Sequence, residues 1–219
     1  MPTVIVWMKE ESNFHGHLKI SEVLGGIMKI KYLTRVAILA AVSAILMYIE
    51  FPLPFVPTFL KIDLSDFPAL IAAFSMGPIA GIIVELIKNL VHLVASSTLF
   101  VGELANFIIG SVFVGVAGLV YKYKKTKLNA SIGMGLGIIV MSIVAVVVNI
   151  YVLLPLYAKA FGMDIDAIVS MSQVVNKNII GLKTLMIFGI TPFNIIKGLL
   201  VSLVTFFSYK KLSRYLHFD

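Results

Sequence analysis

The sequence predicts an all-α integral membrane protein, a bundle of six transmembrane helices. The first observation is composition: of 219 residues, 59% are hydrophobic and only 13% are charged, and the mean hydropathy is +1.01. A soluble domain carries roughly 25% charged residues, so this chain has too few to cover a water-soluble globule. The second observation is that apolar runs long enough to cross about 30 Å of hydrocarbon recur along the chain. Helices satisfy the backbone inside lipid, so a helical bundle fits these runs.

Proline and glycine residues between the apolar runs predict where the helices begin and end. Three prolines between residues 52 and 57 end the first helix, because proline lacks an N–H and biases the preceding residue toward extended geometry. Gly77-Pro78 separates the second helix from the third, and Thr191-Pro192 begins the last, with Thr191 as its N-cap. The stretch 162–178 allows a short surface helix. We therefore expect spans at residues 31–49, 67–76, 79–94, 103–121, 132–157 and 191–211.

Basic residues gather in three places, which predicts the orientation. They precede the first span, separate the fourth from the fifth, and follow the sixth: Lys29, Lys31, Arg35; Lys122, Lys124, Lys125, Lys127; Lys210, Lys211, Arg214. With six spans, all three clusters fall on one side, and cytoplasmic loops carry such excesses. Both termini are therefore expected in the cytoplasm, and the net charge of +7 is a topology signal rather than a nucleic-acid surface.

The chain is expected to divide near residue 28. Residues 1–28 are polar and resemble neither a span nor a signal peptide, so we expect a weakly ordered cytosolic leader, with Met28 as an alternative start. Residues 29–215 form the expected membrane domain.

Ionisable side chains inside the spans each need a reason, because burying one at the bilayer centre costs about 2.5–3.5 kcal/mol. Glu85 and Lys88 are three residues apart and share a helix face, which favours a structural ion pair. The alternative is that Lys88, or the nearby Asn89 and His92, reach a ligand. Lys197 has no carboxylate in its own helix. Its partner is either Asp63 or Asp66 of the proline-rich loop, or a ligand acceptor.

Three asparagines and a small-residue stripe complete the candidates. Asn106, Asn149 and Asn194 lie in apolar helices, where hydrogen bonds between helices are the ordinary explanation. All three, however, fall near the outer helix ends beneath the same loop, as in an apolar pocket with a few placed polar groups. Ala37 and Ala41, then Ala40 and Ala44, are spaced for close helix approach, inside the bundle or to a partner.

Missing motifs narrow the function. The chain has no Walker motif, no HExxH and no cysteine, so it is not expected to hydrolyse ATP or act as a metalloprotease. The remaining enzymatic alternative is a small membrane enzyme that uses Glu85, Lys88 and His92.

Four separated segments, in order, resemble a known family. They are "FPLPFVPTFLKIDLSDFPALIAAFSMGPIAGIIVELIKN", "VGELANFIIG", "NIYVLLPLY" and "TPFNIIKG". Together they are similar to the riboflavin-specific, substrate-binding S component of energy-coupling-factor (ECF) vitamin transporters, over roughly residues 32–212. The resemblance implies a six-helix membrane protein that captures riboflavin outside the cell. It implies docking on a transmembrane T component with two ABC-type ATPases, and no resident cofactor.

The resemblance also assigns residues. It implies that the loop between the first two helices is an extracellular lid, with Leu60, Lys61, Ile62 and Asp63 against the ligand. It implies that Asn149 and Lys197 hydrogen-bond the flavin ring, that Asn106 and Asn194 line the site, and that Ala37 and Ala41 contact the T component. Glu103 lies outside the family pattern and is not counted as a contact, although a carboxylate there would disfavour phosphorylated flavins or bind ribityl hydroxyls. An S component for another vitamin is the alternative within the same architecture.

Overall fold

The computed structural model describes residues 29–216, so the expected leader at 1–28 lies outside the described residues. The first described element is a helix, Lys29–Met47. Of the described residues, 29–37 belong to one compact unit and those from Ile38 onward to a second.

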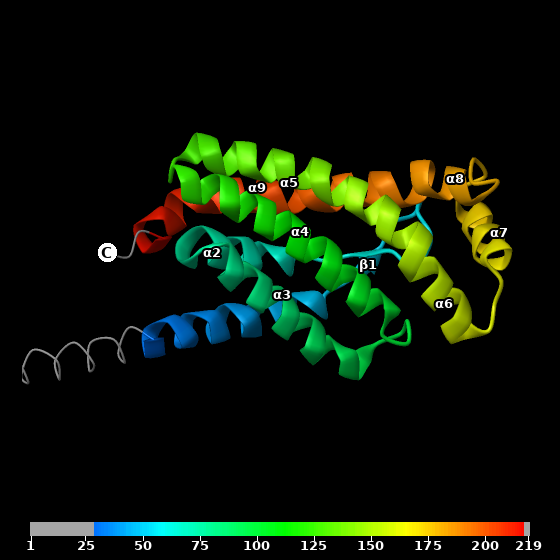
Figure 1. Cartoon of the computed structure of the whole chain (residues 1–219), viewed down its shortest axis with the longest axis horizontal. Coiled ribbons are helices and arrows are strands. Elements are labelled where there is room, and N and C mark those ends of the chain that lie inside the picture. Colours follow the sequence, from blue (N-terminus) through cyan, green and yellow to red (C-terminus); the bar gives the residue numbers. More distant parts are fainter. Residues whose placement is uncertain (1–28, 217–219) are drawn as a thin grey trace, which may run out of the picture. The chain divides into compact units, whose positions relative to one another are not determined.

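The second unit is almost entirely helical (Figure 1). After the first helix its elements follow in this order: β1 (Phe51–Pro52), β2 (Lys61–Ile62), α2 (Asp66–Met76), α3 (Pro78–His92), η1 (Leu93–Ala95), α4 (Val101–Tyr123), α5 (Lys127–Val148), η2 (Asn149–Leu153), α6 (Leu154–Phe161), α7 (Ile165–Val175), α8 (Leu182–Leu185), η3 (Met186–Ile190) and α9 (Thr191–Leu216).

Five described helices are long and apolar enough to cross a membrane: Lys29–Met47, Pro78–Ala95, Val101–Tyr123, Lys127–Phe161 and Leu182–Ser208. They correspond to five of the six expected spans. The remaining expected span is α2, which has 11 residues, whereas a helix that crosses the hydrocarbon alone needs about 20. The short helix expected in the stretch 162–178 is α7.

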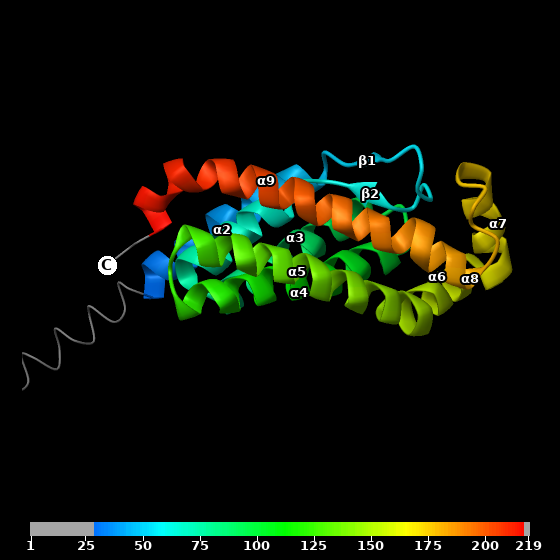
Figure 2. The same cartoon turned by 90° about the horizontal axis from the view of Figure 1, so that it is seen from above.

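Helices adjacent in sequence pack side by side. Contacts join α2 to α3, α3 to α4 and α4 to α5, and α9 lies against both α5 and α2. Figures 1 and 2 both show α9 running along α5, with α7 near the end of the bundle where α6 and α8 meet. An apolar cluster that includes Ile168, Leu154 and Leu185 holds α7 there.

Helices α2 and α3 approach closely at Gly81. A Cβ atom added at Gly81 would lie 2.8 Å from the backbone oxygen of Ala69 and 2.8 Å from the Cβ of Ala73. We expect Gly81→Ala to lower stability by about 1–3 kcal/mol through overpacking, a drop of about 2–12 °C in unfolding midpoint. Circular dichroism of detergent-purified protein measures the midpoint. Gly135→Ala on α5 is the matched control, because nothing lies within 4 Å of its added Cβ; equal midpoints for the two variants would contradict the expectation.

The expected helix start at Thr191 is wrong, because the helix is continuous through this position. A π-helical turn, η3, joins α8 to α9, and the N–H of Thr191 donates to the carbonyl of Met186. Pro192 lacks an N–H and its ring crowds the preceding turn, and a wider turn accommodates both without a break. The same occurs at η2, where the N–H of Leu154 donates to the carbonyl of Asn149, just before Pro155.

The proline-rich loop, residues 52–64, has no helix, as the sequence predicts. Its ends pair as short antiparallel strands, with Phe51 opposite Ile62 and Pro52 opposite Lys61. Between them the loop folds over the bundle, and Val56 and Ile62 are buried against Phe193 of α9. These contacts place the loop across one end of the helices.

Candidate functional site

A cavity lies beneath the proline-rich loop. Its apolar wall consists of aromatic and aliphatic side chains from the loop, α4, α5, η2, α6 and α9: Phe59, Leu60, Ile109, Met141, Leu153, Leu154, Tyr157 and Phe193. Three asparagines, Asn106, Asn149 and Asn194, interrupt this wall. A mostly apolar pocket with a few placed polar groups is the common form of a small-molecule site.

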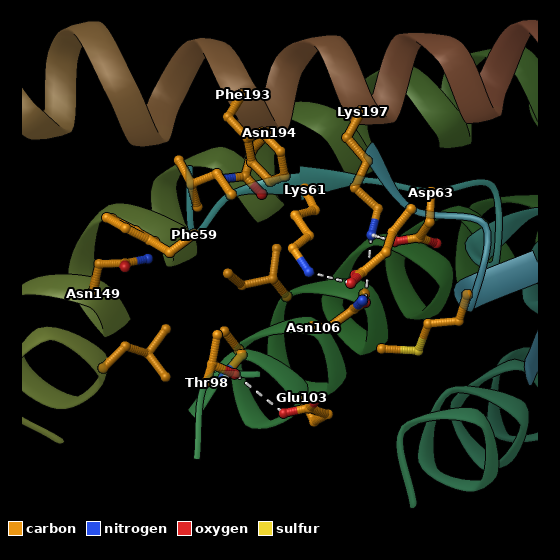
Figure 3. A pocket seen from close by; sticks show the side chains of 18 of the residues that line it. Phe59, Lys61, Asp63, Thr98, Glu103, Asn106, Asn149, Phe193, Asn194 and Lys197 are labelled. Atoms are coloured by element: carbon orange, nitrogen blue, oxygen red, sulfur yellow. Dashed lines mark hydrogen bonds and ion pairs between the residues drawn. The ribbon is translucent and has the colours of Figure 1, made fainter. Parts of the chain in front are cut away.

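Two of the asparagines are fixed by their own helices. The Nδ2 groups of Asn149 and Asn194 donate to the carbonyl oxygens of Ala145 and Ile190, each at 2.8 Å and one turn back. Each amide retains its oxygen and a second N–H, so it can accept one hydrogen bond from a ligand and donate another. The side-chain oxygen of Asn106 accepts from Lys197 at 3.4 Å. The three expected asparagines therefore line one cavity (Figure 3).

Lys197 connects α9 to the proline-rich loop. Its Nζ lies 3.0 Å from Oδ2 of Asp63 and 3.6 Å from Oδ2 of Asp66, and all three side chains are buried. The expectation that Asp63 or Asp66 pairs with this lysine is confirmed, and both do so. Burial alone would raise the pKa of the Asp63 carboxyl, but the ammonium groups of Lys197 and Lys88 outweigh it and lower the pKa to about 2. Asp63 is therefore a carboxylate that holds the lysine in place.

Lys88 extends the same network behind the cavity. The expected pair with Glu85 is present at 2.8 Å, and Lys88 also donates to Ser65 at 2.7 Å and to Asp66. The side chain of Lys88 is 0% exposed. Asp66, the first residue of α2, is thus shared by lysines from α3 and α9. Lys88 therefore holds the start of α2 against α3. The geometry supports a structural ion pair rather than contact with a ligand.

Glu103 lines the cavity, although it lies outside the pattern that carries the family resemblance. Its Oε1 lies 2.9 Å from Nδ1 of His92, and its Oε2 accepts from Ser96 at 2.8 Å and from Thr98 at 3.3 Å. The carboxylate is buried yet hydrogen-bonded by all three residues. A sequence signal was available: Glu103 is three residues before Asn106 and so shares its helix face.

The expected lid residues divide between two faces of β2. Leu60, Lys61 and Asp63 line the cavity, whereas Ile62 is buried in the apolar cluster with Val56 and Phe193. Alternation along an extended segment puts Lys61 and Asp63 opposite Ile62, because neighbouring side chains point to opposite faces. Leu60, next to Lys61, lines the cavity and also packs against the cluster of Ile62. Lys61 pairs with Glu50 and donates to Ser97 at 3.4 Å, so it joins the loop to the segment that precedes α4.

The alanines of the first helix differ in exposure. Ala40 and Ala44 are buried, at 1% and 5% exposure, whereas Ala37 and Ala41 are exposed. Of these four alanines, only Ala40 and Ala44 are packed within the chain.

Comparison with known proteins defines the class. The family model described as "ECF transporter, substrate-specific component" matches residues 31–209. A solved structure of the S component of a bacterial ECF transporter is similar with a TM-score of 0.69 and 36% identity, covering 87% of this chain and 99% of that chain. The chain belongs to the substrate-specific components of ECF transporters.

Two curated relatives carry more specific names. The riboflavin transporter RibU of Staphylococcus aureus (strain TCH60) is 39% identical over 186 residues, covering 85% of this chain and 92% of that protein. The riboflavin transporter FmnP of Bacillus subtilis (strain 168) is 33% identical over 180 residues, covering 81% and 89%. Membership of this family makes the chain a multi-pass membrane transport component and not an enzyme, which removes the alternative built on Glu85, Lys88 and His92.

Proposed function

We propose that this chain binds riboflavin and serves as the substrate-specificity subunit of an ATP-driven ECF transporter. One observation carries the proposal: the cavity beneath the proline-rich loop combines an apolar wall with amides, in a chain 39% identical to a protein named as a riboflavin transporter. Riboflavin is the transported ligand, so the protein needs no resident cofactor.

The chemistry of a flavin matches the lining. The isoalloxazine ring is flat and largely apolar, and it offers carbonyl and ring-nitrogen acceptors together with one imide N–H. Phe59 and Tyr157, whose ring centroids are 5.5 Å apart, form an aromatic wall, and Phe193 contributes from α9. Asn149 and Asn194 can both donate to and accept from the ring, whereas Lys197 can only donate. We assign ligand contacts also to Leu60, Lys61, Asp63 and Asn106.

The proline-rich loop is proposed as the extracellular lid of a six-helix membrane domain that spans residues 29–215. In this arrangement α2 counts as one of the six membrane helices. It is too short to cross the membrane alone, and the loop that precedes it completes the crossing. Proline restricts the unbound loop, which reduces the ordering cost when the lid closes over a ligand. Lys197 and Asp63 would hold the closed position. The basic clusters then place both termini in the cytoplasm.

The partners follow from the class. We propose that a transmembrane T component carrying two ABC-type ATPases supplies the energy, since the sequence has no nucleotide-binding motif of its own. The exposed pair Ala37 and Ala41 is the proposed contact, because small residues let a partner helix approach closely.

The test is the colour of the purified protein. We expect protein expressed in a riboflavin-containing host and purified in detergent to be yellow, with flavin absorption bands. Released ligand should be identified as riboflavin by chromatography, and the apoprotein should quench riboflavin fluorescence on titration. A colourless preparation that leaves riboflavin fluorescence unchanged would contradict the proposal and favour an S component for another vitamin.

A further inference from the structure

The cavity has an excess of negative charge on its lining. Four carboxylates line it, and two lysines: Glu50, Asp63, Asp66 and Glu103; Lys61 and Lys197. Carboxylates therefore outnumber ammonium groups on the lining by two. Behind the wall, Lys88 is shared by Glu85 and Asp66. An anionic ligand therefore enters a site that already repels it, in surroundings that water screens poorly.

Glu103 is the lining carboxylate whose ion-pair partner, among the described residues, is a histidine rather than a lysine. Lys61 pairs with Glu50, and Lys197 pairs with Asp63 and Asp66. Among the described residues, the ion-pair partner of Glu103 is His92, and its other partners, Ser96 and Thr98, are hydroxyls. A hydroxyl hydrogen-bonds a carboxylate but leaves its charge in place. At 4% exposure, Glu103 keeps this charge away from bulk solvent.

Glu103 lies at the hydroxyl-bearing end of the cavity. Ser97, Thr98 and Gly102 line the wall beside it, whereas Asn149, Phe193 and Asn194 line the part formed by η2 and α9. Figure 3 shows Thr98 and Glu103 together, apart from Phe193 and Asn194. A flavin has the same asymmetry, a flat ring at one end and a polyhydroxyl ribityl chain at the other. The matching orientation puts the ring against the aromatic and amide wall and the chain toward Glu103.

We propose that Glu103 determines specificity for the free alcohol form of the flavin: its carboxylate accepts from ribityl hydroxyls and repels the phosphate of FMN. The inference rests on the proposed function. A hydroxyl can donate to a carboxylate, which makes a charge-assisted bond. The phosphate of FMN carries a charge of about −1.5 to −2 and no matching donor, so it meets a like charge in a poorly screened site. When the external flavin is phosphorylated, hydrolysis of its phosphate monoester before uptake would then supply the form that binds more tightly.

The experiment compares the dissociation constants of riboflavin and FMN by fluorescence quenching at pH 8, where the phosphate, with a second pKa of about 6, is fully ionised. For the unmodified protein we expect FMN to bind weaker than riboflavin by about tenfold or more. Glu103→Gln should reduce that ratio by about tenfold, chiefly through tighter FMN binding. Glu103→Asp, which keeps the charge, should preserve the ratio.

Two controls separate charge at this position from other causes. Asp166→Asn removes the same charge from an exposed position on α7 and should leave the ratio unchanged. A neutral 5′-acetyl ester of riboflavin lacks the 5′-hydroxyl, as FMN does, but carries no charge, and the unmodified protein should bind it more tightly than FMN. This measurement needs no variant, so it tests the inference even if Glu103→Gln fails to fold.

The outcomes are distinct for the two proposals. Equal affinities for riboflavin and FMN, an unchanged ratio in Glu103→Gln, or a neutral ester bound no more tightly than FMN would each overturn the role of Glu103 while riboflavin binding stands. Unmodified protein that binds neither flavin would overturn the proposed function, and this inference with it.

Discussion

Lys88→Ala is expected to destabilise the protein more than any other single substitution considered for this chain. Lys88 is the buried cation between Asp66 of α2 and Glu85 of its own helix, and it also donates to Ser65. Removing one partner of a buried ion pair typically costs about 3–5 kcal/mol, because the remaining charge is left uncompensated. The expected decrease in unfolding midpoint is about 6–20 °C. Circular dichroism or a thermal aggregation assay in detergent measures it.

Lys61→Ala is the matched control for this prediction. Lys61 also pairs with a carboxylate, Glu50, but the two side chains are 30% and 24% exposed. Exposed ion pairs contribute about 0–1 kcal/mol, so the control should lose little stability. In a second variant, Lys88→Met combined with Glu85→Gln and Asp66→Asn removes the charges together and should recover part of the loss. A midpoint for Lys88→Ala equal to that of Lys61→Ala would refute the role assigned to the network.

Lys197→Met is expected to weaken riboflavin binding by about tenfold to a hundredfold. Methionine approximates the length of the lysine stem, so the substitution removes the ammonium group and leaves most of the packing. A hydrogen bond from a charged donor contributes about 1.5–3 kcal/mol, which corresponds to this range of affinity. The loss also leaves Asp63 and Asp66 without their cation on α9. Fluorescence titration with riboflavin gives the dissociation constant.

A double variant distinguishes the two contributions of Lys197. Lys197→Met with Asp63→Asn removes the uncompensated carboxylate and should return the unfolding midpoint toward that of the unmodified protein. Riboflavin binding should remain at least about tenfold weaker, because the ligand still lacks its donor. If the double variant binds riboflavin normally, Lys197 acts only by holding the loop. An unchanged affinity in Lys197→Met alone would remove Lys197 from the site.

The sequence predicted those candidate site residues that are polar or charged within apolar helices, because burying such a group requires a partner. An apolar helix that carries a lone lysine requires a distant carboxylate, and the loop offered only a few, so the Lys197–Asp63 pair could be anticipated. Glu85 and Lys88 followed from helix spacing alone. The asparagines were candidates for the same reason, and the cavity brings them together. In each case the cost of an unpaired polar group in lipid limited the alternatives.

What the sequence could not supply depends on tertiary placement and on departures from ideal geometry. That Asp66 serves two lysines is known only once the start of α2 meets α3 and α9. The continuity of the helix through Thr191 required a π-helical turn, which a proline in a sequence does not distinguish from a break. The family resemblance implies that Ile62 lies against the ligand together with its neighbours, whereas the structure buries Ile62 in the apolar cluster with Val56 and Phe193. Glu103 was not predicted as a ligand contact, because it lies outside the family pattern.

The two π-helical turns also determine the direction in which the cavity-lining side chains that follow them point. A residue in an α-helix advances by about 100° around the axis, so one additional residue per turn redirects every side chain beyond it. Asn194 and Lys197 follow η3, and Leu154 and Tyr157 follow η2. Shortening either turn by one residue would leave a membrane-crossing helix intact while pointing these side chains toward lipid or neighbouring helices. In these two helices, the cavity lining is therefore more sensitive to a change in the number of residues than to a change in hydrophobicity.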